Sequence, residues 1–299
     1  MQKHYDIILL GSGQIAQAIL EKSFGRRVLV LCRSPEKVRK HEDVDCIPWV
    51  AGETAVPLGV TGDLVINCIM PGSRYVSRCG IDAGLSLLST NGRYTHLSTI
   101  AVKSKPTVDS WLIGFSGDVY IRVKKYELTY LRAKQVNKLI IYPGIVVGAN
   151  TGWDKFFTKL KTCKTASFGF SLDKPAPIIE IRDLAEGILR ASSVKTDVNE
   201  CFFPDPKMDV LANWEECLRP MCSSLTVSNY TYFPSKMKNA IVTLLNSELV
   251  PTWVWEKISN LNMSERNSRS REFEKCEVAV QHMNVTGMTN FYIGCDYVL

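Results

Sequence analysis

Apolar runs of strand length alternate with helix-like segments through the first half of the chain. Such runs are typical of strands that are buried on both faces of a parallel sheet. In chain order the predicted strands are residues 3–10, 28–32, 44–50, 63–69 and 94–102, followed by 139–148 with its exit loop. Helical character falls between them, at residues 14–22, 35–40, 76–88 and 118–132. The alternation predicts an α/β protein with a doubly wound parallel sheet, the Rossmann fold.

The pattern becomes less regular after residue 148. Helices are predicted over 152–161, 210–218, 235–245 and 253–261, a strand near 201–204, and a short strand followed by an amphipathic helix over 177–191. We expect a dinucleotide-binding domain over residues 1–150, onto which residues 178–192 pack back. A smaller mixed substrate-binding subdomain is expected over residues 151–299.

Composition and charge are those of an ordinary globular protein. The 299 residues are 45% hydrophobic and 22% charged, and the net charge of +6 is spread along the chain. No dense basic block indicates nucleic acid, and no apolar stretch reaches the length of a membrane span. The ten cysteines are irregularly spaced, with no C-x-x-C pair and no secretory signal. We therefore expect reduced thiols, a cytoplasmic location and no metal site.

A glycine-rich turn directly follows the first predicted strand. Gly11, Ser12, Gly13, Gln14, Ile15 and Ala16 form a G-x-G-x-x-A motif. Gly11 permits a tight turn, and Gly13 lets the backbone approach a pyrophosphate, which the first N–H groups of a helix bind. The motif alone also fits a tight turn in an ordinary α/β protein, but its place between two buried strands favours a dinucleotide site.

The end of the second predicted strand bears on which dinucleotide is bound. Sites that prefer NAD usually carry Asp or Glu there, whereas this chain has Cys32-Arg33-Ser34. A guanidinium suits a 2′-phosphate and a carboxylate repels it. Arg33 and Ser34 therefore favour NADP, with a solvated loop position as the alternative role of Arg33.

Polar residues also stand where the fourth predicted strand ends, at the edge where open α/β sheets bind ligands. Asn67 and Cys68 are candidates for contacts with the cofactor, and Met70, in the loop that follows, is a candidate for a substrate contact. The alternative role of Asn67 is a hydrogen bond that ends the strand.

The order of the later motifs resembles the short-chain dehydrogenase/reductase superfamily. Ser98-Thr99, Tyr120-Ile-Arg-Val-Lys124 and Tyr142-Pro143-Gly144 follow the glycine turn as in its extended NAD(P)-dependent epimerase/dehydratase branch, which acts on nucleotide sugars. Residues 179–191, IEIRDLAEGILRA, resemble the Val-Asp-Asp-Leu-Ala segment of that branch. The resemblance covers roughly residues 5–220. It implies that Lys124, Tyr142, Pro143 and Gly144 also contact the cofactor.

The resemblance implies a catalytic set of Tyr120, Lys124 and Thr99, and acid–base chemistry accounts for it. A phenol with a pKa near 10 is a poor base, but a lysine four residues later lies on the same helix face and its charge favours the phenolate. In this set Thr99 binds the reacting oxygen of the substrate. Ser98 is the alternative for that role, and it is also a candidate for another contact with the substrate. Tyr130 and Lys134 repeat the spacing, but they lie mid-helix, too close to residue 139.

These motifs predict an NADP-dependent oxidoreductase, epimerase or dehydratase that acts on a nucleotide sugar or a similar small hydroxy or keto compound. Leu10, where the branch has a first glycine, and Tyr142, where it often has Arg, indicate an atypical member. The alternatives are a catalytically silent NADP-binding sensor and a structural partner protein. The substrate, the reaction type and the formation of a homodimer are left open.

Overall fold

The computed structural model describes two separate parts of the chain. The described residues are 3–39, 42–70, 73–103, 115–148, 151, 158, 161, 165–168, 176, 178–193, 199–203, 213–219 and 224–227. One compact unit comprises residues 1–99, 123–151 and 177–209, and the second comprises 100–122, 152–176 and 210–299. The predicted helices over 152–161, 235–245 and 253–261 lie outside the described residues or are reached only at isolated positions.

The first unit is built on a seven-stranded parallel sheet with the order β10-β6-β5-β4-β1-β2-β3. Its strands are β1 (Lys3–Leu10), β2 (Val28–Cys32), β3 (Val44–Pro48), β4 (Val60–Asn67), β5 (Leu88–Leu97), β6 (Lys138–Pro143) and β10 (Glu200–Phe203). This arrangement confirms the predicted doubly wound Rossmann fold. The chain crosses from β3 to β4 without a helix, through a link that is rich in Gly.

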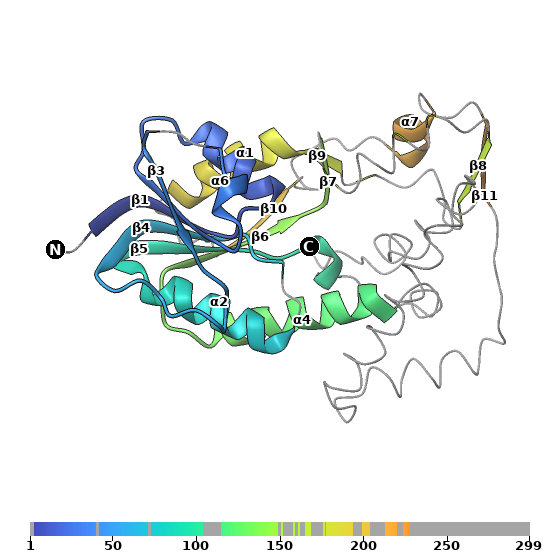
Figure 1. Ribbon diagram of the computed structural model, residues 1–299. Helices are drawn as coiled ribbons and strands as arrows, with labels where there is room; N and C mark the ends of the chain where they lie inside the picture. Colours follow the sequence, from blue (N-terminus) through green and yellow to red (C-terminus); the bar gives the residue numbers. More distant parts are fainter. Residues whose placement is uncertain are drawn as a thin grey trace. The chain divides into compact units, whose positions relative to one another are not determined.

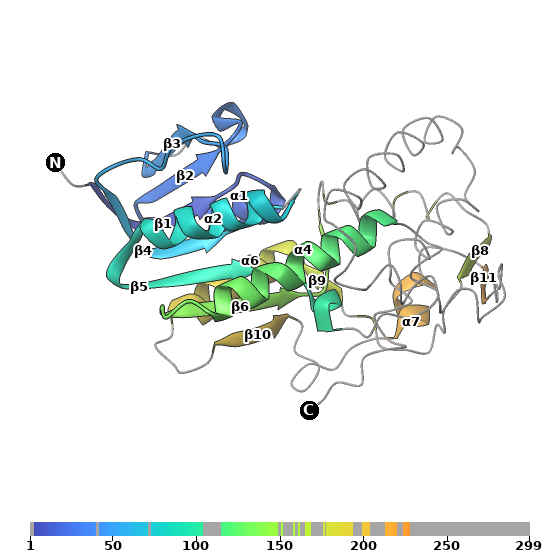
Figure 2. The ribbon, with the colours of Figure 1, turned by 90° about the horizontal axis from the view of Figure 1, so that it is seen from below.

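Helices cover both faces of this sheet (Figures 1 and 2). Helices α1 (Gln14–Lys22) and α6 (Ile181–Ser193) lie together on one face, while α2 (Arg74–Ser86) and the later part of α4 (Phe115–Arg132) lie on the other. Short 3₁₀ turns η1 (Pro35–Lys37) and η2 (Ile100–Lys103) follow β2 and β5. The remaining elements are β7 (Ile145–Val147) paired with β9 (Ile178–Glu180), β8 (Thr165–Phe168) paired with β11 (Ser224–Val227), and α7 (Trp214–Leu218).

The core between the sheet and its first helical layer explains the continuous apolar runs. Ile7 and Leu9 of β1 pack in one cluster with Ile19 of α1 and with Leu184 and Ile188 of α6, and each is at most 1% exposed. Burial of an aliphatic side chain of this size contributes about 1.5–3 kcal/mol. Helix α6 thus contributes to the same hydrophobic core as β1, although more than half of the chain length separates the two elements in sequence.

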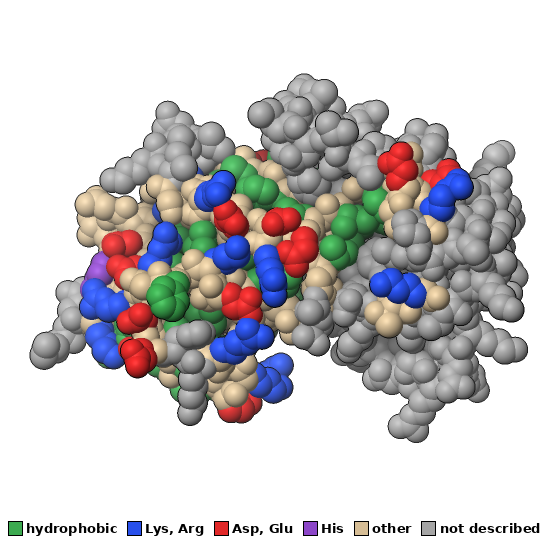
Figure 3. All heavy atoms as spheres, turned by 90° about the horizontal axis from the view of Figure 1, so that it is seen from above, with side chains coloured by type: hydrophobic (Ala, Val, Ile, Leu, Met, Phe, Trp, Pro, Cys, Tyr) green, Lys and Arg blue, Asp and Glu red, His purple; other side chains and the backbone are tan. Residues whose placement is uncertain are grey.

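Charged side chains of both signs are interspersed over this helical face (Figure 3). Glu186 of α6 pairs with Lys22 of α1 at 3.4 Å and with Arg190 at 2.5 Å, and Arg39 pairs with Glu21. Exposed pairs of this kind contribute at most about 1 kcal/mol each. Among the residues that the structure describes, no helix is both long and apolar enough to cross a membrane.

Strand β5 departs most from the predicted pattern. It begins at Leu88, six residues before the predicted start, and ends at Leu97 rather than at residue 102. Its first residues, LSTNGR, carry no apolar alternation because they are partly or fully exposed up to Asn91. The apolar residues after the strand, Ile100 and Val102, are buried, but they lie in the turn of η2 and not in a strand.

Candidate active site at the carboxyl edge of the sheet

The glycine turn lies between the ends of three strands. Gly11 follows β1, donates its N–H to Leu31 O of β2 at 2.8 Å and has a φ of +99°, in the left-handed region that favours glycine. A Cβ on Gly11 would approach the backbone carbonyl of Cys68, beyond β4, at 3.4 Å. The turn is therefore held tightly against the sheet on this side.

Gly13 faces open space instead. It is the N-cap of α1, has a φ of −67° and gives no side-chain cap to the helix, and a Cβ built on it would meet no atom within 4 Å. No acidic residue lies in the first turn, which contains Gln14 and Ile15. Uncapped N–H groups at the positive end of the helix dipole suit an anion, so this turn fits the pyrophosphate of a dinucleotide.

Gln17 ties the turn to the segment after β2. Its Nε2 lies 3.4 Å from both Ser12 O and Lys37 O. Arg33 is exposed between β2 and η1 and has no hydrogen bond or ion pair with another described residue. Ser34, the N-cap of η1, makes no side-chain cap bond. The geometry thus leaves the guanidinium at the sheet edge unengaged by the described part of the chain.

The residues after β4 have different environments. Asn67 is 3% exposed, donates from Nδ2 to Tyr94 Oη at 2.9 Å and accepts from Ile69 N at 3.0 Å through Oδ1. With these hydrogen bonds Asn67 has the strand-end role that the sequence offered as the alternative to a cofactor contact. Burial raises the pKa of the Cys68 thiol to about 12, so it is neutral, and Met70 is 79% exposed in the following loop.

Ser98 and Thr99 directly follow the end of β5. Ser98 donates its N–H to Ile141 O of β6 at 2.8 Å and is 4% exposed. Its hydroxyl has no hydrogen-bond partner among the described residues. A buried hydroxyl without a partner costs about 1–3 kcal/mol, and such a group is a reasonable point of contact for a ligand. Thr99 is partly buried.

Lys124 reaches this strand end from α4. Its Nζ donates to Leu97 O at 2.8 Å and forms an ion pair with Glu127 Oε2 at 2.9 Å, and the two side chains are 3% and 2% exposed. Tyr120 lies one turn earlier in α4, and its side chain lies outside the described residues. The structure therefore brings Lys124 to the strand end that carries Ser98 and Thr99.

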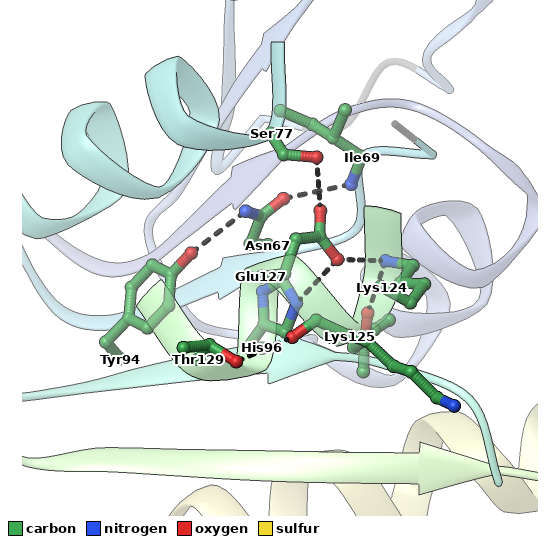
Figure 4. A network of polar contacts seen from close by, with 10 residues as sticks. Asn67, Ile69, Ser77, Tyr94, His96, Lys124, Lys125, Glu127 and Thr129 are labelled. Carbon is green, nitrogen blue, oxygen red and sulfur yellow. Dashed lines mark hydrogen bonds and ion pairs between the residues drawn. The ribbon is translucent and has the colours of Figure 1, made fainter. Parts of the chain in front are cut away.

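A buried polar network surrounds the Lys124 ammonium (Figure 4). Glu127 accepts from Ser77 Oγ of α2 at 2.8 Å through Oε1, and its Oε2 lies 3.1 Å from His96 Nε2 of β5. Burial lowers the pKa of both the Lys124 ammonium and the His96 imidazole. Burial by itself raises the pKa of Glu127, but the hydrogen bond and charge of His96 and the charge of Lys124 outweigh it, so its net pKa is lowered.

Sequence reasoning missed His96, Glu127 and Ser77. Glu127 follows Lys124 by three residues on one helix face, and His96 shares a strand face with Ser98 because strand side chains alternate. Those two spacings were the available signals. The contact with Ser77 depends on the packing of α2 against α4, which no local pattern encodes.

The predicted cofactor residues of the sixth strand lie among packed neighbours. Tyr142 is fully buried, stacks on Phe202 with ring centroids 4.8 Å apart and accepts from Arg132 Nη2 at 3.3 Å. Burial raises the pKa of its phenol. Pro143 pairs with Phe203 of β10, and Gly144 N donates to Phe203 O at 2.7 Å. Contact of these residues with a cofactor stays a prediction.

The second Tyr–Lys pair has another role. Tyr130 Oη donates to Asp82 of α2, at 2.7 Å from Oδ1 and 2.9 Å from Oδ2. Lys134 Nζ lies 3.4 Å from Asp82 Oδ1 and 4.5 Å from the centre of the Tyr130 ring. The pair joins two helices at a distance from the sheet edge that carries Ser98.

Comparison with known proteins places the fold. No protein-family model and no curated protein matches the sequence. The UDP-N-acetylglucosamine 4-epimerase from Methanobrevibacter ruminantium M1, in complex with UDP-N-acetylmuramic acid, matches with a TM-score of 0.53 and 14% identity over 76% of this chain and 86% of its own. The GalE-like L-threonine dehydrogenase from Cupriavidus necator, in its holo form, matches with a TM-score of 0.51 and 14% identity. The match covers 79% of this chain and 88% of the dehydrogenase.

A third solved structure, MoeE5 in complex with UDP-glucuronic acid and NAD, has a TM-score of 0.52 and 12% identity over 74% of this chain and 89% of its own. Identities at this level show a common fold. The predicted Rossmann fold is thereby confirmed, and the chain shares its architecture with these three structures.

Proposed function

We propose that the protein is an NADP-dependent oxidoreductase, epimerase or dehydratase that acts on a nucleotide sugar or a similar small hydroxy or keto compound. The observation that carries this proposal is the bond from Lys124 Nζ to Leu97 O, 2.8 Å long. It holds a helix-borne ammonium beside the strand end with the two candidate hydroxyls. A buried positive charge at this place has a direct use in lowering the pKa of a nearby phenol.

The glycine turn and the end of β2 are the groups that we assign to the cofactor. The open N–H groups after Gly13 suit the pyrophosphate, and the exposed Arg33 suits a 2′-phosphate, with Ser34 beside it. The bound nicotinamide would supply hydride transfer. Fold relatives support a nicotinamide dinucleotide in general, since the MoeE5 structure contains NAD. The preference for NADP rests on Arg33 and Ser34, which stand where sites that prefer NAD carry Asp or Glu.

We assign proton transfer to Tyr120, assisted by the Lys124 charge one helical turn later. Thr99 binds the reacting oxygen of the substrate, and Ser98 and Met70 contact the substrate beside it. A nucleotide sugar is the favoured substrate class because two fold relatives are described with UDP-linked ligands. We also propose that residues 151–299 form the substrate-binding subdomain and that the protein forms a homodimer, which sedimentation analysis would test.

A panel of nucleotide sugars tests the proposed function. Purified protein is incubated with each compound and NADPH or NADP⁺, and products and the nicotinamide absorbance are followed together. Net loss of NADPH indicates a reductase, and a product without net loss indicates an epimerase or a dehydratase. Tight NADPH binding without turnover of any compound would contradict the enzymatic assignment.

That last outcome corresponds to the second candidate, a catalytically silent NADP-binding sensor. One observation motivates it: the open turn at Gly13 and the exposed Arg33 are the assigned cofactor-binding features, and neither of them transfers a proton. A sensor needs only the glycine turn and Arg33, and variants of Tyr120 and Thr99 would then leave the NADPH affinity unchanged.

A further inference from the structure

Three different elements converge on the carboxylate of Glu127. Lys124 precedes it on α4, His96 approaches from β5 and Ser77 from α2, at 2.9, 3.1 and 2.8 Å respectively. All four side chains are at least 97% buried. Buried ion pairs are weak sources of stability, because the loss of hydration largely offsets the attraction. The position of the network beside Ser98 therefore calls for a reason other than stability.

We propose that Glu127 is a positioning residue that fixes the direction of the Lys124 ammonium and keeps it charged, and that His96 and Ser77 hold the carboxylate in place. The role of Lys124 in catalysis rests on the proposed function, whereas its electrostatic dependence on Glu127 does not.

The direction of the ammonium follows from two anchors on different elements. Leu97 O accepts from Lys124 Nζ at the end of β5, and Glu127 Oε2 binds it from the next turn of α4. Glu127 cannot turn away easily, since its other oxygen accepts from Ser77 Oγ. The network thus fixes the long and otherwise flexible lysine side chain.

The charge of Lys124 depends on the same carboxylate. Among the described residues, the titratable groups that act on Lys124 include Glu127 from its own helix, Cys68 from the end of β4, and His96 from β5. Cys68 is neutral because burial raises its pKa to about 12, and burial also favours the neutral form of His96. Of these groups Glu127 alone carries a negative charge at neutral pH, and it offsets the burial that disfavours the ammonium.

Titration of Lys124 in the full-length protein tests the proposal without any substrate. Protein with ¹³Cε-labelled lysine is followed by NMR as the pH is raised, and Lys124→Met identifies the Lys124 signal. Glu127→Gln removes the charge and keeps the shape. We expect the Lys124 midpoint to move to lower pH in this variant. Asp82→Asn is the matched control. It also removes a carboxylate between α2 and α4, but Asp82 pairs with Lys134 and not with Lys124, so the Lys124 midpoint should stay in place.

A Lys124 midpoint that is identical in Glu127→Gln and in the parent would overturn the proposal. Should Glu127→Gln not fold, Ser77→Ala keeps the charge and only loosens the carboxylate, and a smaller shift in the same direction is expected. An unshifted midpoint in a folded Ser77→Ala variant, with Glu127→Gln unable to fold, would equally count against the positioning role.

Catalysis gives a separate readout. Because Lys124 loses its proton more readily in Glu127→Gln, the deficit in kcat should be larger at about pH 9 than at about pH 6. A deficit that is equal at both values would contradict the link to catalysis. A shifted Lys124 midpoint in a protein that turns over no nucleotide sugar and no other hydroxy or keto compound would retain the electrostatic role of Glu127 and reject the proposed function.

Discussion

The backbone N–H of Gly11 donates to Leu31 O at 2.8 Å, which ties the glycine turn to β2 near the point where Arg33 leaves the sheet. This bond places the two candidate phosphate-binding features side by side. It also separates the roles of the two glycines in the turn, since Gly11 is packed against the sheet and Gly13 is open.

Gly13→Val is therefore expected to abolish NADPH binding while the protein stays folded. The φ of −67° is compatible with valine, and its side chain would occupy the open space where the pyrophosphate is proposed to lie. Fluorescence titration of NADPH together with thermal unfolding checks both points. Gly11→Ala is the contrast: its φ of +99° should cost about 1–3 kcal/mol in unfolding free energy. Unchanged NADPH affinity in a folded Gly13→Val variant would show that this turn does not bind the phosphates of the cofactor.

Arg33→Ala is expected to remove most of the preference for NADPH over NADH. We expect the parent to bind NADPH at least tenfold more tightly, about 1.4 kcal/mol, because a guanidinium binds a 2′-phosphate. Calorimetric Kd values for both cofactors provide the measurement. Arg39→Ala, which removes an exposed arginine paired with Glu21, is the control. Equal affinities in the parent protein would show that Arg33 does not select the cofactor.

Tyr120→Phe removes one oxygen and should lower kcat by roughly 10²–10⁴ while NADPH binding survives, as expected for the loss of a general acid–base. Steady-state kinetics on the best nucleotide sugar of the panel measure the effect. Lys124→Met should lose activity and part of the NADPH affinity. Tyr130→Phe, whose phenol donates to Asp82, should keep parental kcat and loses only an interhelical hydrogen bond. Parental activity in Tyr120→Phe would favour the sensor.

His96→Gln should flatten the dependence of stability on pH. Burial lowers the pKa of His96 below its ordinary value of 6.5, so on acidification through 6.5 the unfolded chain takes up a proton before the folded protein does. The parent therefore loses stability as the pH falls from about 7 to about 5.5, and the variant should lose less. Urea unfolding at several pH values measures this.

The sequence was most informative where one physical cause dominates. Buried strands such as β1 and β2 are continuously apolar, and the turn at Gly11 needs a backbone conformation that glycine adopts most easily. Those two signals were enough for the fold and for the position of the candidate cofactor turn. They failed at β5, whose exposed first half resembles a loop and whose end is followed by a buried turn.

The candidate site was predictable in its helical part and less so elsewhere. Lys124 was found from its spacing to Tyr120, because helix periodicity is local. Asn67 could be placed at a strand end, but its partner Tyr94 comes from the neighbouring strand. Ser77 meets Glu127 only because α2 and α4 pack together, fifty positions apart in sequence. Contacts of this kind are products of the fold and have no signature in a single segment.

The burial of β1 and α1 against α6 also governs how the protein can fold during synthesis. Leu20 of α1 leaves the ribosome about 160 residues before Leu184 of α6, which packs in the same core cluster. At the usual translation rate of 5–20 residues per second, the apolar surface of β1 and α1 is made roughly ten to thirty seconds before α6, which covers it. The nascent chain therefore exposes an apolar, aggregation-prone face during this interval. A chaperone that binds apolar surface would act on that face before α6 is made.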